Sequence, residues 1–560
     1  MSTGNSLPDR WLTDWVPSQK LPVYTRANAG EVLPDPCSPL CWTVVWEPGV
    51  VMGWRDCQID VGTFSEHEMD VRRPEVVGLF GGYLFINAST ARLFGVRGPG
   101  LAPEMIDATY FGTHPDVPPY VPEPWHENAD NTARLGEWMG RVMTAQSLPE
   151  LIEDQKISNE ARASRPDLAN LDEVSLINRM RSFTATLRRD FQHHLDMTAG
   201  TSIGPGALGA IATALGDPSL VLTLITAIGD VDSAAPSRAM WELSRLSKDS
   251  REYAEKFAAF IHDFGSRGPN EWDIRSDTWE TKPEFALAVI DRIRLQSDSE
   301  SPKIRNARKA EERKALTEDI RAKVKPLGEE LAGQLEGALI ASSQMAIRER
   351  TKTNIIRALH EVRMAFRELG RRRAAEGTLK DPHHVFALLD SELDQFLFEG
   401  ASMKDTLATR HAQWQELQLL EPPFFIKNGI VPPLSEYKKK GQSNAAKAVV
   451  GEVVQGVPGC TGQYVGRARV ILDPTEPGDL EPGDVLIAPN TDPAWTPLFM
   501  SCGAVVVNVG AAISHAIIVS RELGLPCVVS ATDATVRIPD GALIEVNGDT
   551  GAVTILEIPA

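Results

Sequence analysis

Hydrophobic and polar positions divide the chain into three stretches with different periodicities. Up to about residue 130, short apolar runs such as 42–46 and 83–86 alternate with segments rich in Pro and Gly, which predicts loops and short strands. From about residue 130 to 420 the apolar spacing is helical. From about residue 450 onward, β-branched runs such as 503–507 predict buried strands.

The helical stretch contains one apolar face that repeats at intervals of four, three, four and three residues. The residues on this face are Ile355, Leu359, Val362, Phe366 and Leu369. This spacing predicts an amphipathic helix with one buried side. By contrast, residues 308–325 are almost all charged or Ala, which predicts an exposed helix or a mobile arm.

Paired prolines at 422–423 and 432–433, followed by a polar run at 438–444, predict a linker. We therefore expect a multidomain α+β protein. Its first domain spans 1–420 and is mostly helical, with an irregular, strand-containing N-terminal part. A hinge follows at 421–449, and a small β/β/α domain spans 450–560.

The most informative local pattern surrounds His515. A predicted strand at 503–507 leads into a Gly-containing turn, and a predicted helix at 516–523 stops at Gly524. This order places Ser514 and His515 at a helix start, where free N–H groups and the helix dipole favour an anion. A neutral imidazole at that place can act as a nucleophile and carry a phosphoryl group. The alternative is that His515 only caps or packs the turn.

Composition restricts the partners and the compartment. The chain of 560 residues has a net charge of −19, which argues against nucleic acid or an anionic membrane as a partner. Its six cysteines are scattered, and Cys37 and Cys41 have no second pair at zinc spacing, so we expect no metal site. The start of the chain has no apolar signal core. We expect a soluble cytoplasmic protein.

The C-terminal motifs resemble one known family. They are Ser514-His515-Ala516, Ile518-Val519, Arg521-Glu522-Leu523-Gly524, Pro526, Thr491–Phe499, Gly466–Val470 and Asn547–Gly551. This set, in this order, resembles the phosphohistidine swivelling domain of the dikinases and phosphoenolpyruvate-utilising enzymes. The resemblance implies that His515 carries the phosphoryl group. The implied supporting residues are Ser514, Gly510, Thr491, Asp492 and Arg521.

Two positions depart from the family pattern. Ala511 stands in place of a second Gly, and Ile513 stands in place of the usual Thr. Without a hydroxyl at 513, regulation by phosphorylation of that residue is not expected.

The N-terminal part carries a looser resemblance, in family order. Its blocks are Asn28–Leu40, Gly81–Asn87, Phe264–Glu271, Arg348–Lys352 and Asp381–Phe386. They resemble the substrate-binding region of the rifampin phosphotransferases and of the related histidine subunit of phenylphosphate synthase. The candidates implied for a substrate site are Arg267, Glu271, Arg348 and Lys352.

Two readings remain open around Arg267. Arg267 and Glu271 lie four residues apart, so they can also be a plain helix ion pair.

Ser266 stands where relatives often carry His. If that His is a base in them, its role here is lost or moved to His262 or Asp263.

The sequence shows no glycine-rich phosphate loop of the Walker or Rossmann type. The resemblance then implies a split enzyme, in which a separate ATP-grasp subunit binds ATP and Mg²⁺ and loads His515, with release of AMP and phosphate. This chain would transfer the phosphoryl group to a hydroxyl of a phenol or alcohol. The alternatives are a rifampin-like antibiotic phosphotransferase and a non-catalytic phosphocarrier or regulatory module.

Overall fold

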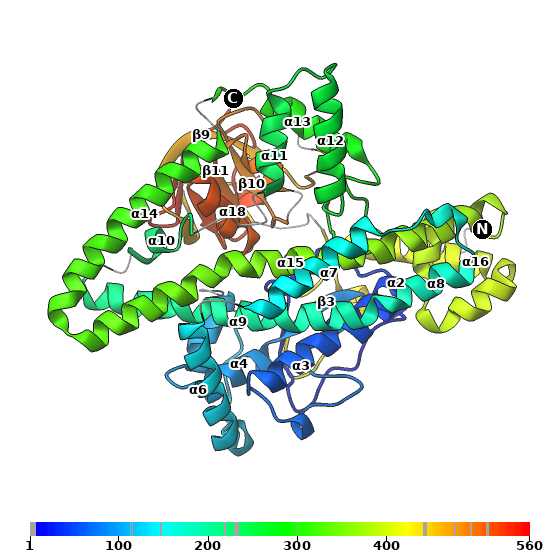
Figure 1. Cartoon of the computed structure of the whole chain (residues 1–560), viewed down its shortest axis with the longest axis horizontal. Coiled ribbons are helices and arrows are strands. Elements are labelled where there is room, and N and C mark those ends of the chain that lie inside the picture. Colours follow the sequence, from blue (N-terminus) through cyan, green and yellow to red (C-terminus); the bar gives the residue numbers. More distant parts are fainter. Residues whose placement is uncertain are drawn as a thin grey trace.

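The computed structural model describes residues 7–111, 114, 116–145, 148–217, 220–228, 235–298, 301–440, 445–474, 476, 478–492, 495–510 and 514–559. At its centre the long helices α9 (Thr184–Ala214) and α15 (Glu329–Ala375) lie side by side. In the view of Figure 1, α3, α4 and α6 lie below this pair and the C-terminal sheet lies above it. The expected α+β organisation, with a large helical part followed by a sheet-containing part, is confirmed.

A small antiparallel sheet organises the N-terminal part. Its strand order is β2 (Val77–Phe80), β3 (Tyr83–Asn87), β1 (Tyr24–Thr25) and β5 (Phe425–Ile426). Gly81 and Gly82 form the two-residue turn between β2 and β3 with φ values of 59° and 78°, a left-handed conformation that glycine adopts without strain. The strand predicted at 83–86 is therefore confirmed.

The strand predicted at 42–46 is wrong. Residues Trp42–Val51 form a π-helix, η1, which continues from the short helix α2 (Pro39–Cys41) and leads into α3 (Met52–Asp60). Trp42, Val45 and Trp46 are all buried. A segment that is apolar on every side has the same pattern as a buried strand, so periodicity does not distinguish the two.

The other helices of the first 420 residues surround the central pair. They are α1 (Ala29–Val32), α4 (Ala88–Arg97), α5 (Pro103–Phe111), α6 (Ala129–Thr144), α7 (Pro149–Ala163), α8 (Glu173–Ser182), α10 (Leu220–Leu224), α11 (Ala235–Ser244), α12 (Arg251–Phe264), α13 (Pro283–Ile293), α14 (Pro302–Val324) and α16 (Leu393–Gln418). Short 3₁₀ helices lie at Glu66–Glu68, Pro124–His126, Leu168–Asn170, Lys325–Leu327, Pro382–Ala387, Asp390–Glu392 and Leu434–Glu436.

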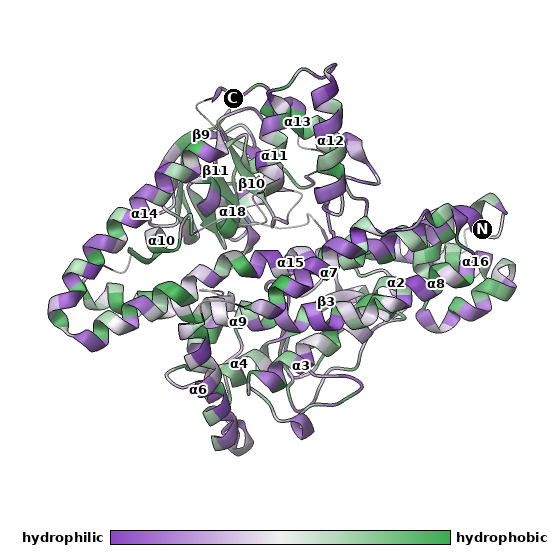
Figure 2. Ribbon diagram, in the orientation of Figure 1, coloured by the Kyte–Doolittle hydropathy of each residue, from purple (hydrophilic) through white to green (hydrophobic). Residues whose placement is uncertain are grey.

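Two helical predictions are confirmed. The five apolar positions from Ile355 to Leu369 lie on α15, and all five side chains are fully buried. The charged stretch 308–325 falls almost entirely on α14, which Figure 2 shows as largely hydrophilic. Its C-terminal end is anchored, because Ile320 and Val324 pack in a small core with Leu224 of α10.

The C-terminal part is an eight-stranded sheet with three helices. The strand order is β7 (Val453–Gln455), β14 (Ala552–Glu557), β13 (Leu543–Asn547), β9 (Gln463–Val470), β10 (Asp484–Ala488), β11 (Cys502–Val507), β12 (Cys527–Val529) and β8 (Val457–Cys460). The helices are α17 (Thr496–Phe499), α18 (His515–Leu523) and α19 (Ala534–Arg537). Strands β9 to β12 are parallel neighbours, and Figure 2 shows hydrophobic residues concentrated around β10 and β11. The strand at 503–507 and the helix that ends at Gly524 are confirmed.

Helices α11, α12 and α13 share a hydrophobic core with the C-terminal sheet. Trp241, Phe260 and Ile290 from these helices belong to the same buried cluster as Leu498 and Phe499. The hinge expected at 421–449 begins as ordered structure: besides β5, which joins the N-terminal sheet, β4 (Leu420–Glu421) pairs with β6 (Lys438–Lys439). Residues 441–444 of that hinge lie outside the described residues, and the domain boundaries stay predictions.

In the part of the chain that is described, every helix is too short or too polar to cross a bilayer.

Candidate active site

His515 is the first residue of α18, directly after the cap residue Ser514. The chain reaches this point from β11 through a turn that passes close to β12: a Cβ added to Gly510 would lie 2.9 Å from the Cβ of Val529. A larger residue at 510 would displace the turn, which explains why this position needs glycine. Ala511 and Ile513 lie outside the described residues.

Two threonine hydroxyl groups hold the His515 ring. Thr491 Oγ1 lies 3.1 Å from Nδ1, and Thr496 Oγ1 lies 3.0 Å from Nε2. Because a hydroxyl both donates and accepts, this arrangement accommodates either neutral tautomer. The ring is buried, with Phe499 at 5.9 Å between ring centroids. Thr491 was predicted as a supporting residue; Thr496 was not, although it lies in the same sequence block.

The C-terminal domain is docked on the N-terminal part at His515. The backbone N–H of His515 donates to Glu31 Oε2 of α1 at 3.3 Å. Next to this contact, Asn490 Nδ2 donates to the carbonyl oxygen of Gly30 at 2.6 Å. A carboxylate at the first N–H of a helix is favoured by the helix dipole. Glu31 was not singled out from the sequence.

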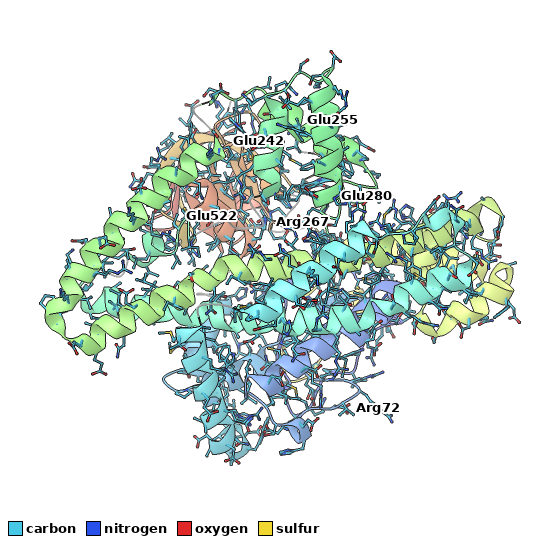
Figure 3. All side chains as sticks on the ribbon, viewed as in Figure 1. Arg72, Glu242, Glu255, Arg267, Glu280 and Glu522 are labelled. Atoms are coloured by element: carbon cyan, nitrogen blue, oxygen red, sulfur yellow. The ribbon has the colours of Figure 1, made fainter. Side chains whose placement is uncertain are left out.

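A second set of docking contacts comes from the loop after α12 and from α14. The backbone N–H of Asn270 donates to Asp492 Oδ2 at 3.0 Å, so the predicted residue Asp492 joins the two parts of the chain. Asn306 of α14 donates to Glu522 Oε2 of α18 at 3.1 Å. Figure 3 shows Glu522 at the C-terminal sheet domain and Arg267 between this domain and α15.

Buried cations face the imidazole from the other part of the chain. Arg267 and Lys352 both act electrostatically on His515, and Arg267 is only 3 % exposed. Glu271 lies between them: its Oε1 is 3.3 Å from Arg267 Nη1 and 3.9 Å from Lys352 Nζ. Three of the four predicted substrate-domain residues therefore form one cluster, in which Arg267 and Glu271 are buried and Lys352 is half-buried. The reading of Arg267 and Glu271 as an ion pair also holds, but the pair is buried at the site rather than solvated.

The electrostatics of the cluster favour an uncharged imidazole. Burial, and then Lys352 and Arg267, hold the pKa of His515 well below its usual value. A neutral ring keeps a free electron pair on one nitrogen, as a nucleophile requires. The same cations would neutralise the negative charge of an anionic group next to the ring.

Arg348, the fourth predicted substrate-domain residue, lies one turn of α15 before Lys352. Its Nε donates to Thr198 of α9 at 3.2 Å, and its Nη1 lies 3.2 Å from Glu349. His194 of α9 is buried near the same residues, with Nδ1 3.0 Å from Thr351 Oγ1. Burial, Arg348 and Lys352 lower the pKa of His194 well below its usual value. His194 is a neighbour of the site that the sequence pattern did not select.

Other candidates lie in different surroundings. Arg521 is buried but donates to the carbonyl oxygen of Gly459 at 3.1 Å, which ties α18 to β8. Ser514 Oγ is buried and makes no hydrogen bond, so it is free to meet a ligand. His262 and Asp263 pair with each other at 2.9 Å on the exposed side of α12, and therefore do not line the buried site.

Cys37 and Cys41 form a cluster with Asp273. Among the described residues, this is the only group of three possible metal ligands whose ligand atoms all lie within 4.8 Å of one another. Both oxygens of Asp273 already accept hydrogen bonds from Ser38 at 2.7 Å, and burial raises the pKa of both thiols. Because the carboxylate oxygens already accept hydrogen bonds and the thiols keep their protons, packing in the protein core explains this cluster.

Two protein-family models match the two parts of the chain that form this site. Residues 480–551 match the family model described as "PEP-utilising enzyme, mobile domain", and residues 243–350 match "Rifampicin phosphotransferase fourth domain". The first match includes Thr491 and His515, and the second includes Arg267 and Arg348. The resemblance to the phosphoenolpyruvate-utilising mobile domains and to the rifampin phosphotransferases is confirmed.

Several of the individual proteins that this chain resembles are named as phosphotransferases or as another transferase. The rifampicin phosphotransferase of Streptomyces sviceus is 30 % identical over 312 residues, which are 54 % of this chain and 35 % of that protein. The rifampicin phosphotransferase of Bacillus subtilis is 29 % identical over 53 % of this chain and 34 % of its own length. The prodigiosin synthesizing transferase PigC of Serratia marcescens is 28 % identical over 57 % of this chain and 34 % of its own length. The chain thus spans about a third of these relatives.

Proposed function

From its similarity to PEP-utilising mobile domains and to phosphotransferases, we propose that this chain transfers a phosphoryl group from His515 to a hydroxyl acceptor. The observation that carries the proposal is the position of His515: its backbone N–H binds Glu31, and its buried ring is acted on electrostatically by Arg267 and Lys352, all from a different part of the chain. Two hydroxyl groups fix the orientation of the ring, and the nearby cations can neutralise the charge of a phosphoryl group bound to it.

The docked arrangement corresponds to the acceptor half of the reaction. In this half, the phosphorylated ring delivers its group to a phenol or alcohol held by the N-terminal part. Arg267 and Lys352 neutralise the phosphoryl oxygens, while Thr491, Thr496 and Ser514 orient the ring and its group. Division of one hard transfer into two steps through histidine lowers the barrier of each, and positioning supplies most of the remainder.

Loading of His515 takes place elsewhere in this proposal. By family resemblance, His515 attacks the β-phosphorus of ATP, AMP is released, and the terminal phosphate is lost to water. ATP and Mg²⁺ are bound mainly by a separate ATP-grasp subunit, and the residues described here receive the group and pass it on. The hinge at 421–449 would carry the domain between the two sites.

Labelling with ATP tests the proposal. The chain is mixed with a candidate ATP-grasp partner and with ATP labelled at either the β- or the γ-phosphorus, and acid-labile label on the protein is measured. We expect label on the wild type and none on His515→Ala. Equal label on both proteins would exclude His515 as the nucleophile, and label from the γ-position alone would exclude the dikinase route.

A second acceptor class follows from the relatives named rifampicin phosphotransferase. Labelled wild type is offered either phenol or rifampicin, and transfer of label to each is compared. Transfer to rifampicin but not to phenol would replace the small-acceptor assignment with the antibiotic one and leave the role of His515 intact.

A further inference from the structure

Glu31 is a half-buried residue with one carboxylate oxygen engaged and one free. Oε2 accepts the backbone N–H of His515, whereas Oε1 is buried and makes no hydrogen bond. An unsatisfied buried carboxylate oxygen is costly, and such groups need an explanation in a native structure. The simplest explanation is that a proton-bearing ligand occupies the space next to Oε1.

Other buried polar groups around His515 also lack hydrogen bonds. They include Ser514 Oγ, next to His515, and Arg267 Nη1, which forms an ion pair with Glu271 but no hydrogen bond and whose charge acts on the His515 ring. The free Glu31 oxygen can accept the proton of an acceptor hydroxyl, while the Ser hydroxyl and the guanidinium nitrogen can donate to the oxygens of a phosphoryl group. The unsatisfied atoms thus point to the same reacting pair, an alcohol or phenol and the phosphorylated His515.

The position of Glu31 is fixed by the short helix α1 and by the residues that anchor it. Helix α1 is only four residues long, and Arg26 fixes its C-terminal end by donating to the carbonyl oxygen of Leu33 at 2.9 Å and to that of Leu84 at 2.5 Å. Asn28 begins the helix with φ of 57°, a left-handed conformation that few residues other than glycine adopt. Such local strain is common where a side chain has to be aimed.

The charges around Glu31 come from three elements. Lys352 and Arg348 act on it from α15, the N–H of His515 binds it from α18, and the Arg26 guanidinium, directly after β1, packs against Gly30. Burial raises the pKa of Glu31 to about 7, although the His515 N–H, Lys352 and Arg348 each lower it. A carboxylate in this range can take up and release a proton near neutral pH.

Two other groups are less suited to proton transfer. Glu271 lies between Arg267 and Lys352 and therefore positions the two cations. His194 is hydrogen-bonded to Thr351 on α15. Glu31 touches the residue that carries the phosphoryl group.

We propose that Glu31 is the general base of the transfer, taking the proton of the acceptor hydroxyl as its oxygen attacks the phosphorus on His515. The oxygen–phosphorus bond forms while the nitrogen–phosphorus bond breaks, and that electron pair returns to the imidazole, which leaves as the neutral ring because its other nitrogen keeps its proton. The hydroxyl proton ends on Glu31 and passes to solvent when the domain undocks. This inference rests on the proposed function, and it adds a catalytic residue to the acceptor site.

The test uses the full chain, loaded without a nucleotide-binding partner. Potassium phosphoramidate phosphorylates His515 chemically, with His515→Ala as the loading control. Phosphorylated wild type, Glu31→Gln and Asn490→Ala are mixed with phenol, and phenyl phosphate and inorganic phosphate are followed by phosphorus NMR from about pH 5.5 to about pH 9. Gln keeps the size of Glu31 and an oxygen that can accept the His515 N–H. Asn490→Ala removes only the neighbouring docking contact with Gly30.

We expect the wild-type single-turnover rate to rise with pH through about 7 and then level off, because the base must be ionised. Glu31→Gln should be slower by about 10²-fold and lose that pH dependence. Asn490→Ala should be slower but keep the wild-type pH profile. Thermal unfolding of each variant checks that the fold is retained.

Each other outcome has a defined meaning. If Glu31→Gln matches the wild type in rate and pH profile, Glu31 is not the base. If Glu31→Gln is slow but keeps the wild-type pH profile, Glu31 only docks the domain, and the proposal fails. Transfer to water instead of phenol would overturn the acceptor class, while the same comparison on water still decides the role of Glu31. A wild type that is inert toward both, or equal labelling of His515→Ala, would overturn both proposals.

Discussion

The backbone N–H of His515 donates to a side-chain oxygen of Glu31 across 484 positions of sequence, at 3.3 Å. This contact joins the start of the helix that begins at His515 to the irregular N-terminal segment before α2. In the proposed function, the acceptor site is therefore built from two parts of the chain and is complete only when the C-terminal domain is docked. Variants at the docking contacts should therefore affect transfer to the acceptor without affecting loading of His515.

Asp492→Ala tests this separation. Asp492 accepts the backbone N–H of Asn270, and a hydrogen bond to a charged group contributes about 1.5–3 kcal/mol. We expect the single-turnover transfer rate to fall by about 10-fold or more, with the rate of His515 phosphorylation by phosphoramidate unchanged.

The matched control for this variant is Asp549→Ala. Asp549 also accepts a backbone N–H, that of Gly462, but this contact lies within the C-terminal domain. Asp549→Ala should leave transfer at the wild-type rate. Equal slowing by both variants would show that Asp492 supports the domain itself rather than its docking.

Glu271→Gln should destabilise the protein strongly. Glu271 is 1 % exposed and lies between Arg267 and Lys352, so loss of its charge leaves the buried Arg267 and the half-buried Lys352 without their partner. Removal of one member of a buried ion pair costs about 3–5 kcal/mol. The measurement is the midpoint of urea unfolding followed by tryptophan fluorescence.

Glu255→Gln is the control for Glu271→Gln. Glu255 pairs with Arg251 on α12 at 2.6 Å, but both side chains are exposed, and Figure 3 shows Glu255 on the outer helix. Exposed pairs contribute about 0.2–1 kcal/mol, so the midpoint should hardly move. If Glu271→Gln and Glu255→Gln unfold at the same midpoint, Glu271 is not needed to neutralise the buried cations.

Local sequence patterns predicted the strands and helices that hold the candidate site residues. The strand, glycine turn and helix around His515 follow from residues close in sequence, and so does the buried face of α15 from Ile355 to Leu369. Their periodicity reflects one buried side of one element, which is a local property. The apolar run 42–46 failed because burial on all sides removes that periodicity.

Contacts between distant segments could not be predicted in the same way. Glu31 lies in a recognised block, yet its pairing with His515 depends on how the C-terminal domain docks. Arg521 was expected near the phosphoryl group because it follows the motif, but its guanidinium turns to Gly459 of β8. Which direction a long side chain takes is decided by its neighbours in the folded domain rather than by its spacing from His515.

A buried histidine outside the site should make stability depend on pH. Arg363 Nη1 lies 2.9 Å from His360 Nδ1, and His360 Nε2 lies 2.7 Å from Glu280 Oε2. Arginine only donates, so Nδ1 accepts and the Nε2–H donates to Glu280, which means that the ring is neutral. Burial, as the largest cause, lowers the pKa of His360 to about 3.

The sign of the pH effect follows from proton uptake. In the unfolded chain a histidine has a pKa of about 6.5, so between that pH and about 3 the unfolded state binds one more proton at this position. The contribution of His360 to the free energy of unfolding is therefore present above about pH 6.5 and is lost as the pH falls, by about 1.4 kcal/mol per pH unit. His360→Gln should reduce the slope of urea midpoint against pH between about pH 6 and about pH 5, whereas His67→Gln, at an exposed histidine, should not. An unchanged slope in His360→Gln would mean that the buried ring is already protonated in the folded protein, against the donor geometry of Arg363.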